Sequence, residues 1–143
     1  FVVNSDGEYI DVNLAGHNDY TPLGKSIIMI CCTGPGVHRF EHFDALLQHP
    51  NIKVNLSTIP FMSPLHLAIH LAGNLSFPEQ VVNALLQHQN IDVNLADSGG
   101  RTPLTEAISL KRSEQVNTLL QHQNIDETGK NEQTKKERKM QDE

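Results

Sequence analysis

The fold is decided by residues 63–95, which read SPLHLAIHLAGNLSFPEQVVNALLQHQNIDVNL. Three parts of this stretch each occur three times in the chain: Ser/Thr-Pro-Leu (21–23, 63–65 and 102–104), Leu-Leu-Gln-His (46–49, 85–88 and 119–122) and Val-Asn (12–13, 54–55 and 93–94). The Asn of each Val-Asn pair lies eight positions before the Ser or Thr of the next Ser/Thr-Pro-Leu segment. Successive Leu-Leu-Gln-His segments are 39 and then 34 residues apart. Repetition at this period indicates an array of similar units, and the fold is best predicted unit by unit.

Each unit is expected to contain two helices and an extended arm. The Ser or Thr caps the first helix, and the following Pro occupies the first helical position, where its missing N–H costs nothing. The expected second helices cover about 39–49, 78–88 and 113–122. Apolar residues recur at helical spacing and predict a shared core. Its expected members are Leu23, Ile27, Ile30, Cys31, Phe43, Leu46, Leu47, Leu65, Ala68, Ile69, Ala72, Val82, Leu85 and Leu86.

The ends of the second helices carry Asn rather than Gly. Asn51, Asn90 and Asn124 are expected in the left-handed conformation that closes a helix. The histidines just before them (His49, His88 and His122) are expected to interact, partly charged, with the helix dipole. Asp97-Ser98-Gly99-Gly100 has the composition of a turn at the tip of the arm.

These units resemble the ankyrin repeat. The resemblance rests on Ser63-Pro64-Leu65-His66-Leu67-Ala68, on Asp92-Val93-Asn94 and on Thr102-Pro103-Leu104 with Ala107, and it covers about residues 9–126. It implies an all-α ankyrin-repeat solenoid, made of helix-turn-helix units with short extended hairpin arms. It also implies that His66 bonds the hairpin backbone. Gly24 and Ser26 replace the motif His and Ala in the first unit, and Asp19 and Phe61 stand where the hairpin glycine is expected.

The resemblance divides the chain into three parts. Residues 1–13 match the end of a partial preceding repeat, so residues 1–5 are expected where its helix would end. Residues 14–126 form the ankyrin repeat domain of three repeats, and residues 127–143 form a charged C-terminal extension. The Leu-Leu-Gln-His-Pro/Gln-Asn-Ile-Asp-Val-Asn wording is also similar to ankyrin-type secreted effectors of intracellular bacteria. The extension is either a solvated tail, with a helix over about 131–140, or a secretion signal of such an effector.

Composition limits the possible partners. The formal net charge of -6 argues against binding to nucleic-acid backbones, which requires clustered Lys and Arg. No apolar run reaches the roughly 20 residues that span a bilayer. Neighbouring Cys31 and Cys32 suit a reducing compartment. We expect a monomer in the cytoplasm, or one secreted into a host cell if the chain is an effector.

The eight histidines raise the question of a metal site. His38 and His42, like His66 and His70, lie four positions apart, which puts each pair on one helix face. Zinc needs three or four converging ligands, and the repeat pattern already accounts for His66 and for the histidines after the second helices. The sequence therefore predicts no metal and no cofactor. It also shows no catalytic triad and no phosphate-binding loop, and it predicts no enzyme activity.

The surface formed by the arms and first helices is the candidate site. Alignment of the units puts Tyr20, Met62 and Arg101 in one row, Lys25, Leu67 and Glu106 in the next, and Ile28, His70 and Ser109 a turn beyond. Apolar arm residues in the second unit suggest a partner site, because Met and aromatic residues are enriched at interfaces. Equally, Phe61 could cover the neighbouring arm. The predicted partner-binding residues are Tyr20, Ile59, Phe61, Met62, Leu67, His70 and Arg101.

Three functions follow from this surface. The first is recognition of a partner protein through the concave face, with a bacterial effector acting on a host protein as the specific case. The second is a targeting or substrate-recognition arm of a larger enzyme whose catalytic domain is absent from this chain. The third is a structural spacer within a longer array. Fold alone does not decide among them.

Overall fold

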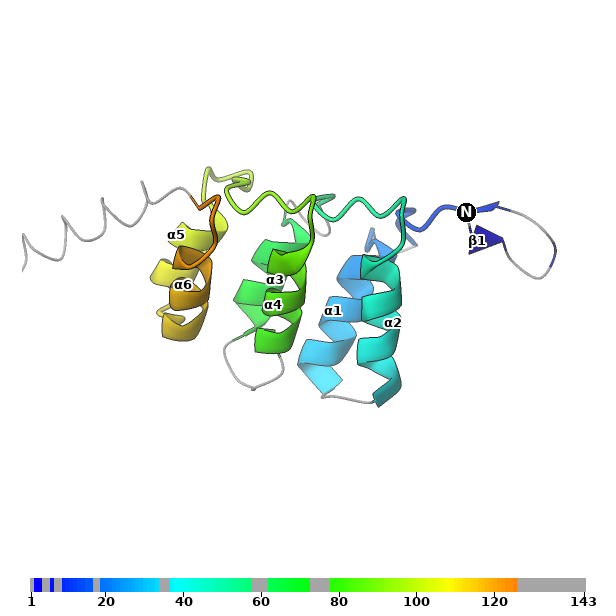
Figure 1. Cartoon of the computed structure of the whole chain (residues 1–143), viewed down its shortest axis with the longest axis horizontal. Coiled ribbons are helices and arrows are strands. Elements are labelled where there is room, and N and C mark those ends of the chain that lie inside the picture. The colour runs from blue at the N-terminus through cyan, green and yellow to red at the C-terminus, as the bar shows by residue number, and fades with distance from the viewer. Residues whose placement is uncertain are drawn as a thin grey trace, which may run out of the picture.

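The computed structural model describes residues 2–3, 6, 9–16, 19–33, 37–57, 62–72 and 78–125. Within these ranges six helices form three antiparallel pairs, arranged side by side in chain order (Figure 1). The pairs are α1 (Pro22–Thr33) with α2 (Val37–Leu47), α3 (Pro64–Leu71) with α4 (Pro78–Gln87), and α5 (Pro103–Ser109) with α6 (Ser113–Leu120). The arms run along one edge of the row. This all-helical solenoid is the predicted fold.

The first helix of every pair begins where the sequence predicts. The hydroxyl oxygen of Thr21 accepts a hydrogen bond from the Gly24 N–H at 3.1 Å. Ser63 and Thr102 accept from the N–H three residues on, each at 3.3 Å. A helix start leaves N–H groups without intrahelical partners, and these caps satisfy one of them in each unit.

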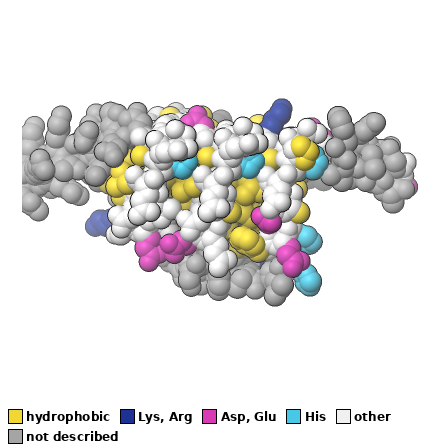
Figure 2. Space-filling model, in the orientation of Figure 1, with side chains coloured by type: hydrophobic (Ala, Val, Ile, Leu, Met, Phe, Trp, Pro, Cys, Tyr) yellow, Lys and Arg dark blue, Asp and Glu magenta, His cyan; other side chains and the backbone are white. Residues whose placement is uncertain are grey.

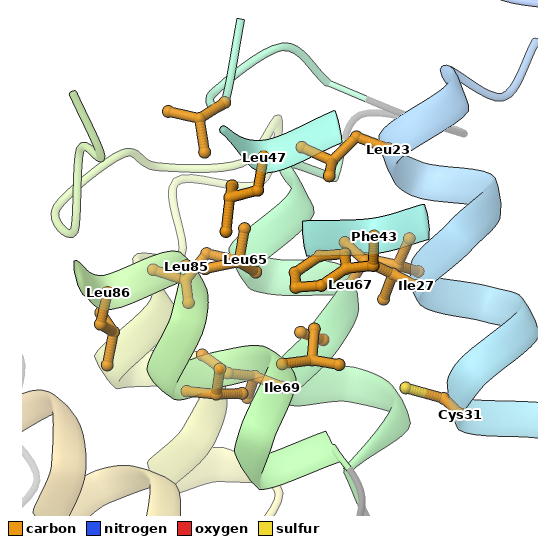
Figure 3. Close-up of a cluster of buried hydrophobic side chains, with 14 of the residues drawn as sticks. Leu23, Ile27, Cys31, Phe43, Leu47, Leu65, Leu67, Ile69, Leu85 and Leu86 are labelled. Carbon is orange, nitrogen blue, oxygen red and sulfur yellow. The ribbon is translucent and has the colours of Figure 1, made fainter. Parts of the chain in front are cut away.

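One continuous core joins the units. Helix α3 packs between α1 and α5, and α4 packs against α6. The predicted core residues are buried, except that Leu46 and Ala72 are only half-buried. Figure 3 shows Ile27, Phe43 and Leu67 in the same apolar cluster, although they come from two different units. No unit buries its apolar side alone, so each depends on its neighbour.

A recurring asparagine ties each arm to the next unit. Asn55 Nδ2 donates to the carbonyl of Asn90 at 2.8 Å, and Asn55 Oδ1 accepts from the Asp92 N–H at 2.8 Å. Asn13 makes the same pair of bonds to Asn51 and Lys53. Side-chain amides here replace the strand pairing that would otherwise satisfy the backbone of an extended arm.

The second helices end differently from the prediction. Among the described residues, Asp19 and Lys111 are the non-glycine residues with positive φ, so Asn51, Asn90 and Asn124 are not left-handed. Instead, Nδ1 of the preceding histidine accepts the Asn N–H, at 3.1 Å in the first two units and 3.2 Å in the third. This bond needs an Nδ1 without a proton, so it does not use the partly charged imidazole that the expected interaction with the helix dipole involves.

Two arms form the same tight turn with different residues. In the third unit the Asp97 N–H donates to the Arg101 carbonyl, and the Gly100 N–H donates to the Asp97 carbonyl. In the first unit Gly16 bonds Tyr20 and Asp19 bonds Gly16 in the same pattern. Asp19 accordingly takes φ of 59°, where Gly100 has 79°. The missing glycine therefore changes the cost of the turn and leaves its shape intact.

The N-terminus departs from the expected helix end. Val2–Val3 form β1, which pairs antiparallel with β2 (Tyr9–Ile10) in a two-stranded ladder. The expectation of a helix end at residues 1–5 is therefore wrong for Val2–Val3. The charged extension predicted for 127–143 lies outside the described residues.

Candidate interaction surface

The predicted partner-binding residues divide into four groups. His70 and Arg101 are exposed, whereas Tyr20 and Met62 are half-buried. Leu67 is buried at 8% exposure. Ile59 and Phe61 lie outside the described residues. Among the described residues, the most exposed of the predicted side chains on the strip formed by the arms and first helices are therefore polar.

Two residues assigned to the exposed second row are not on the surface. Leu67 packs into the core between the first two units, and the side chain of Glu106 is only 5% exposed. Both lie on the side of their unit that faces the preceding pair of helices. The prediction that Leu67 contacts a partner is therefore wrong. The neighbouring unit buries Leu67, and the sequence pattern of one unit does not reveal what its neighbour covers.

The buried Glu106 holds the two exposed residues together. Its Oε1 lies 3.3 Å from Nδ1 of His70 on α3, and its Oε2 lies 3.2 Å from Nη1 of Arg101. The Arg101 contact is an ion pair without a well-directed hydrogen bond. A buried carboxylate is costly unless it is paired, so Glu106 favours conformations in which both partners stay beside it.

His66 secures the arm beneath this cluster. Its Nε2 lies 2.8 Å from the Arg101 carbonyl, which can only accept, so Nε2 carries the proton. Its Nδ1 then accepts from the Ser63 hydroxyl at 2.8 Å. The imidazole is 1% exposed and joins the second helix pair to the third arm, as the resemblance implies.

Asp97 fixes the tip of the same arm. Its Oδ1 accepts from the N–H groups of Gly99 and Arg101, each at 2.9 Å. The pKa of the Asp97 carboxyl lies below its ordinary value, mainly because the Arg101 N–H donates to it. Partial burial opposes this shift, and the Gly99 N–H and the nearby Arg101 charge reinforce it.

The strip therefore offers fixed donors. Arg101 and His70 keep exposed fractions of 57% and 49% while Glu106 restrains both side chains. A restrained donor loses less conformational entropy on binding than a free one. Sequence spacing gave the positions of Arg101 and His70. Glu106, which lies between them, was expected on the surface but is buried. The equivalent position in the second unit holds apolar Leu67, and this difference was the signal in the sequence that could have indicated burial.

A groove lies on the face formed by the second helices. This groove of about 550 Å³ runs between the ends of α2 and α4 and includes Asp44, Gln48, His49, Gln87 and His88. Figure 2 shows this outer face, with histidines spaced along its upper part and carboxylates toward its lower part. The groove could not be predicted from the sequence, because its size depends on how far apart the second helices stand.

The described residues give little support for other chemistry. They contain no group of three or more His, Cys, Asp or Glu side chains arranged to hold a metal. Both cysteines are free thiols. Burial, with a smaller contribution from Cys32, raises the pKa of the Cys31 thiol to about 11, so it is protonated at neutral pH. Within the described ranges, no helix is long and apolar enough to cross a membrane.

Stacked helix pairs, capping Ser/Thr-Pro steps and an asparagine link from each arm to the next unit define a helical repeat solenoid. The chain belongs to the ankyrin repeat family: residues 28–131 match the family described as Ankyrin repeats (3 copies). Ankyrin repeats generally mediate protein–protein interaction and are typically non-catalytic. None of the curated proteins compared with the chain matches it.

Proposed function

We propose that the chain recognises a partner protein through the strip formed by its arms and first helices. The observation that carries the proposal is the Arg101–Glu106–His70 cluster, which holds two exposed donors in place across the junction of two units. Tyr20 and Met62, both half-buried, occupy the position of Arg101 in the arms of the first two units. A few restrained polar and aromatic groups carry most of the binding energy in typical interfaces.

The chemistry of binding follows from the cluster. Arg101 presents a planar guanidinium whose remaining N–H groups suit a carboxylate or a main-chain carbonyl of the partner. His70 adds a ring nitrogen opposite the one that faces Glu106. The partner displaces water from donors that are already placed, so orientation costs little.

The more specific proposal is that this module docks a bacterial effector on a host protein. It is supported by the similarity of the Leu-Leu-Gln-His-Pro/Gln-Asn-Ile-Asp-Val-Asn wording to that class of effectors. The module would then act in the host cell without catalysing a reaction.

The test is capture of partners by proximity labelling and pull-down, with the chain expressed in host-type cells. The strip variant combines Arg101→Gln with Glu106→Gln, which removes the donor charge without leaving the Glu106 carboxylate unpaired, and adds His70→Ala. The matched control is Gln87→Ala with Gln121→Ala on the outer helices. We expect the strip variant to lose partners that the control retains, with both variants folded by circular dichroism. Equal retention by both variants would refute the proposal.

A further inference from the structure

The groove between α2 and α4 lies inside the array, at the junction of the first two units. Its volume is about 550 Å³. Its lining comes from the last turns of the two helices and from the turns that follow them, all within the described ranges 37–57 and 78–125. Binding pockets in proteins typically measure about 300–1,000 Å³, so the groove is large enough for a short peptide segment.

Two histidines in the lining present fixed hydrogen-bond donors. Nδ1 of His49 accepts the Asn51 N–H, and Nδ1 of His88 accepts the Asn90 N–H, each at 3.1 Å. A ring that accepts at Nδ1 carries its proton on Nε2. Both rings are half-buried, and the bond to the following turn restrains each of them. A ligand of the groove must therefore bring acceptor oxygens to two Nε2–H groups.

The groove also has a negative potential. Asp44 is the one aspartate or glutamate among its lining residues, which include no Lys or Arg. Oδ2 of Asp44 accepts from Nε2 of Gln48 at 2.9 Å, and a carboxylate has lone pairs for further bonds. The helices α2 and α4 both end at the groove, and a helix C-terminus carries partial negative charge. The groove therefore attracts a cationic group.

The carboxylate is specific to the first unit. Asn83 and Asn117 stand at the position of Asp44 in the second and third units, although the Leu-Leu-Gln-His segment that follows is the same in all three. The repeat therefore folds twice in this chain without a charge at that position. Packing of the units does not explain Asp44, and binding of a cation does.

The remaining lining is apolar and suits the stem of a long side chain. Leu47 and Ile52 come from the first unit and are buried, and half-buried Ala84 comes from the second. An arginine packs its methylene groups on apolar surface and pairs its planar head with a carboxylate. The peptide groups beside an arginine supply the carbonyl oxygens that the histidines need.

From these features we infer that the groove is a second binding site, which takes an arginine within an extended peptide segment of a partner. The guanidinium pairs with Asp44, and the stem lies on Ile52 and Ala84. Main-chain carbonyls next to the arginine accept from Nε2–H of His49 and His88. A small cation without carbonyl groups leaves these donors unused, and an acidic segment meets charge of its own sign. The site is separate from the strip formed by the arms and first helices and does not rest on the function proposed for it.

The test uses an alanine–arginine–alanine tripeptide with blocked ends, whose one charge is the guanidinium. The same peptide with citrulline keeps the shape of the side chain and loses the charge. Binding to the whole chain is followed at neutral pH by NMR, through the amide signals and the ring signals of His49 and His88. We expect shifts concentrated over residues 44–52 and 84–90. The arginine peptide should bind in the low millimolar range, and the citrulline peptide about fivefold more weakly.

Two variants isolate the carboxylate. Asp44→Asn should weaken the arginine peptide about fivefold and abolish its advantage over citrulline. This variant should fold, because the other units carry Asn at that position, and circular dichroism checks that it does. Glu114→Gln is the matched control, since it removes an exposed carboxylate from α6 and should leave both affinities unchanged.

Several results would overturn the inference. They are equal affinity for the two peptides, equal weakening by Asp44→Asn and Glu114→Gln, shifts spread outside the groove, or no shift at about 10 mM arginine peptide. None of these results bears on the strip formed by the arms and first helices, because neither variant alters it.

Discussion

At the scale of single residues, Asp19 and Gly100 occupy the same place in two arms and both have positive φ. Glycine takes this conformation without strain, whereas a side chain is held there at a cost. Asp19 is exposed, so its side chain gains little from burial. The two positions therefore form a natural pair for measuring the cost of the turn.

Replacement of Asp19 by glycine is expected to stabilise the chain by up to about 1 kcal/mol, because the left-handed conformation no longer carries a Cβ. Gly100→Ala is the matched control and should destabilise by a similar amount. The space around Gly100 is open, so the cost there is conformational rather than steric. Urea denaturation gives both values. Destabilisation by Asp19→Gly would show that its side chain contributes something the geometry does not reveal.

Asp97 makes the stability of the third arm depend on pH. Its carboxyl pKa is lower in the folded chain than the ordinary value of 3.8, so its contribution to stability is complete above that pH. The contribution is lost as the pH falls through the lower folded value. Denaturation of the parent chain and Asp97→Asn should therefore give a stability difference that shrinks below about pH 3.8. A difference that stays constant down to pH 2.5 would rule out this role for Asp97.

At the scale of helices and arms, sequence patterns predicted starts better than ends. Ser63 and Thr102 each precede a proline, and this local signal fixes the first turn whatever surrounds it. The histidine caps at the other ends were not predicted, because the bond from Asn90 N–H to His88 Nδ1 depends on the chain turning back on itself. Exposure was misjudged at Leu67 for a related reason, since the neighbouring helix pair decides it.

Because the units depend on one another, the stability of the whole array should depend strongly on Leu85 in the core. Leu85 is 0% exposed within α4, in the middle unit of the three. Leu85→Ala is expected to cost about 2–5 kcal/mol, from lost apolar contact and the cavity left behind. Because the middle unit supports both neighbours, chemical denaturation should show loss of most of the helical signal at lower denaturant. A cost below about 1 kcal/mol would contradict this placement.

At the scale of the whole molecule, the array presents two faces with different chemistry. The arms and first helices expose Arg101 and His70 around a buried carboxylate, while the outer helices carry the row of histidines and a groove of about 550 Å³. The repeated sequence segments were enough to predict which residues form the array. Which face binds depends on contacts between units, such as that of Glu106 with His70, and these exist only once the units are stacked.

The most direct test of the account is amide hydrogen exchange of the chain with and without its captured partner. Binding through the strip predicts slower exchange in the arms and first helices, over 19–29, 62–72 and 97–108, with little change in α2, α4 and α6. Protection confined to the outer helices, with the strip exchanging as it does in the free chain, would contradict the account.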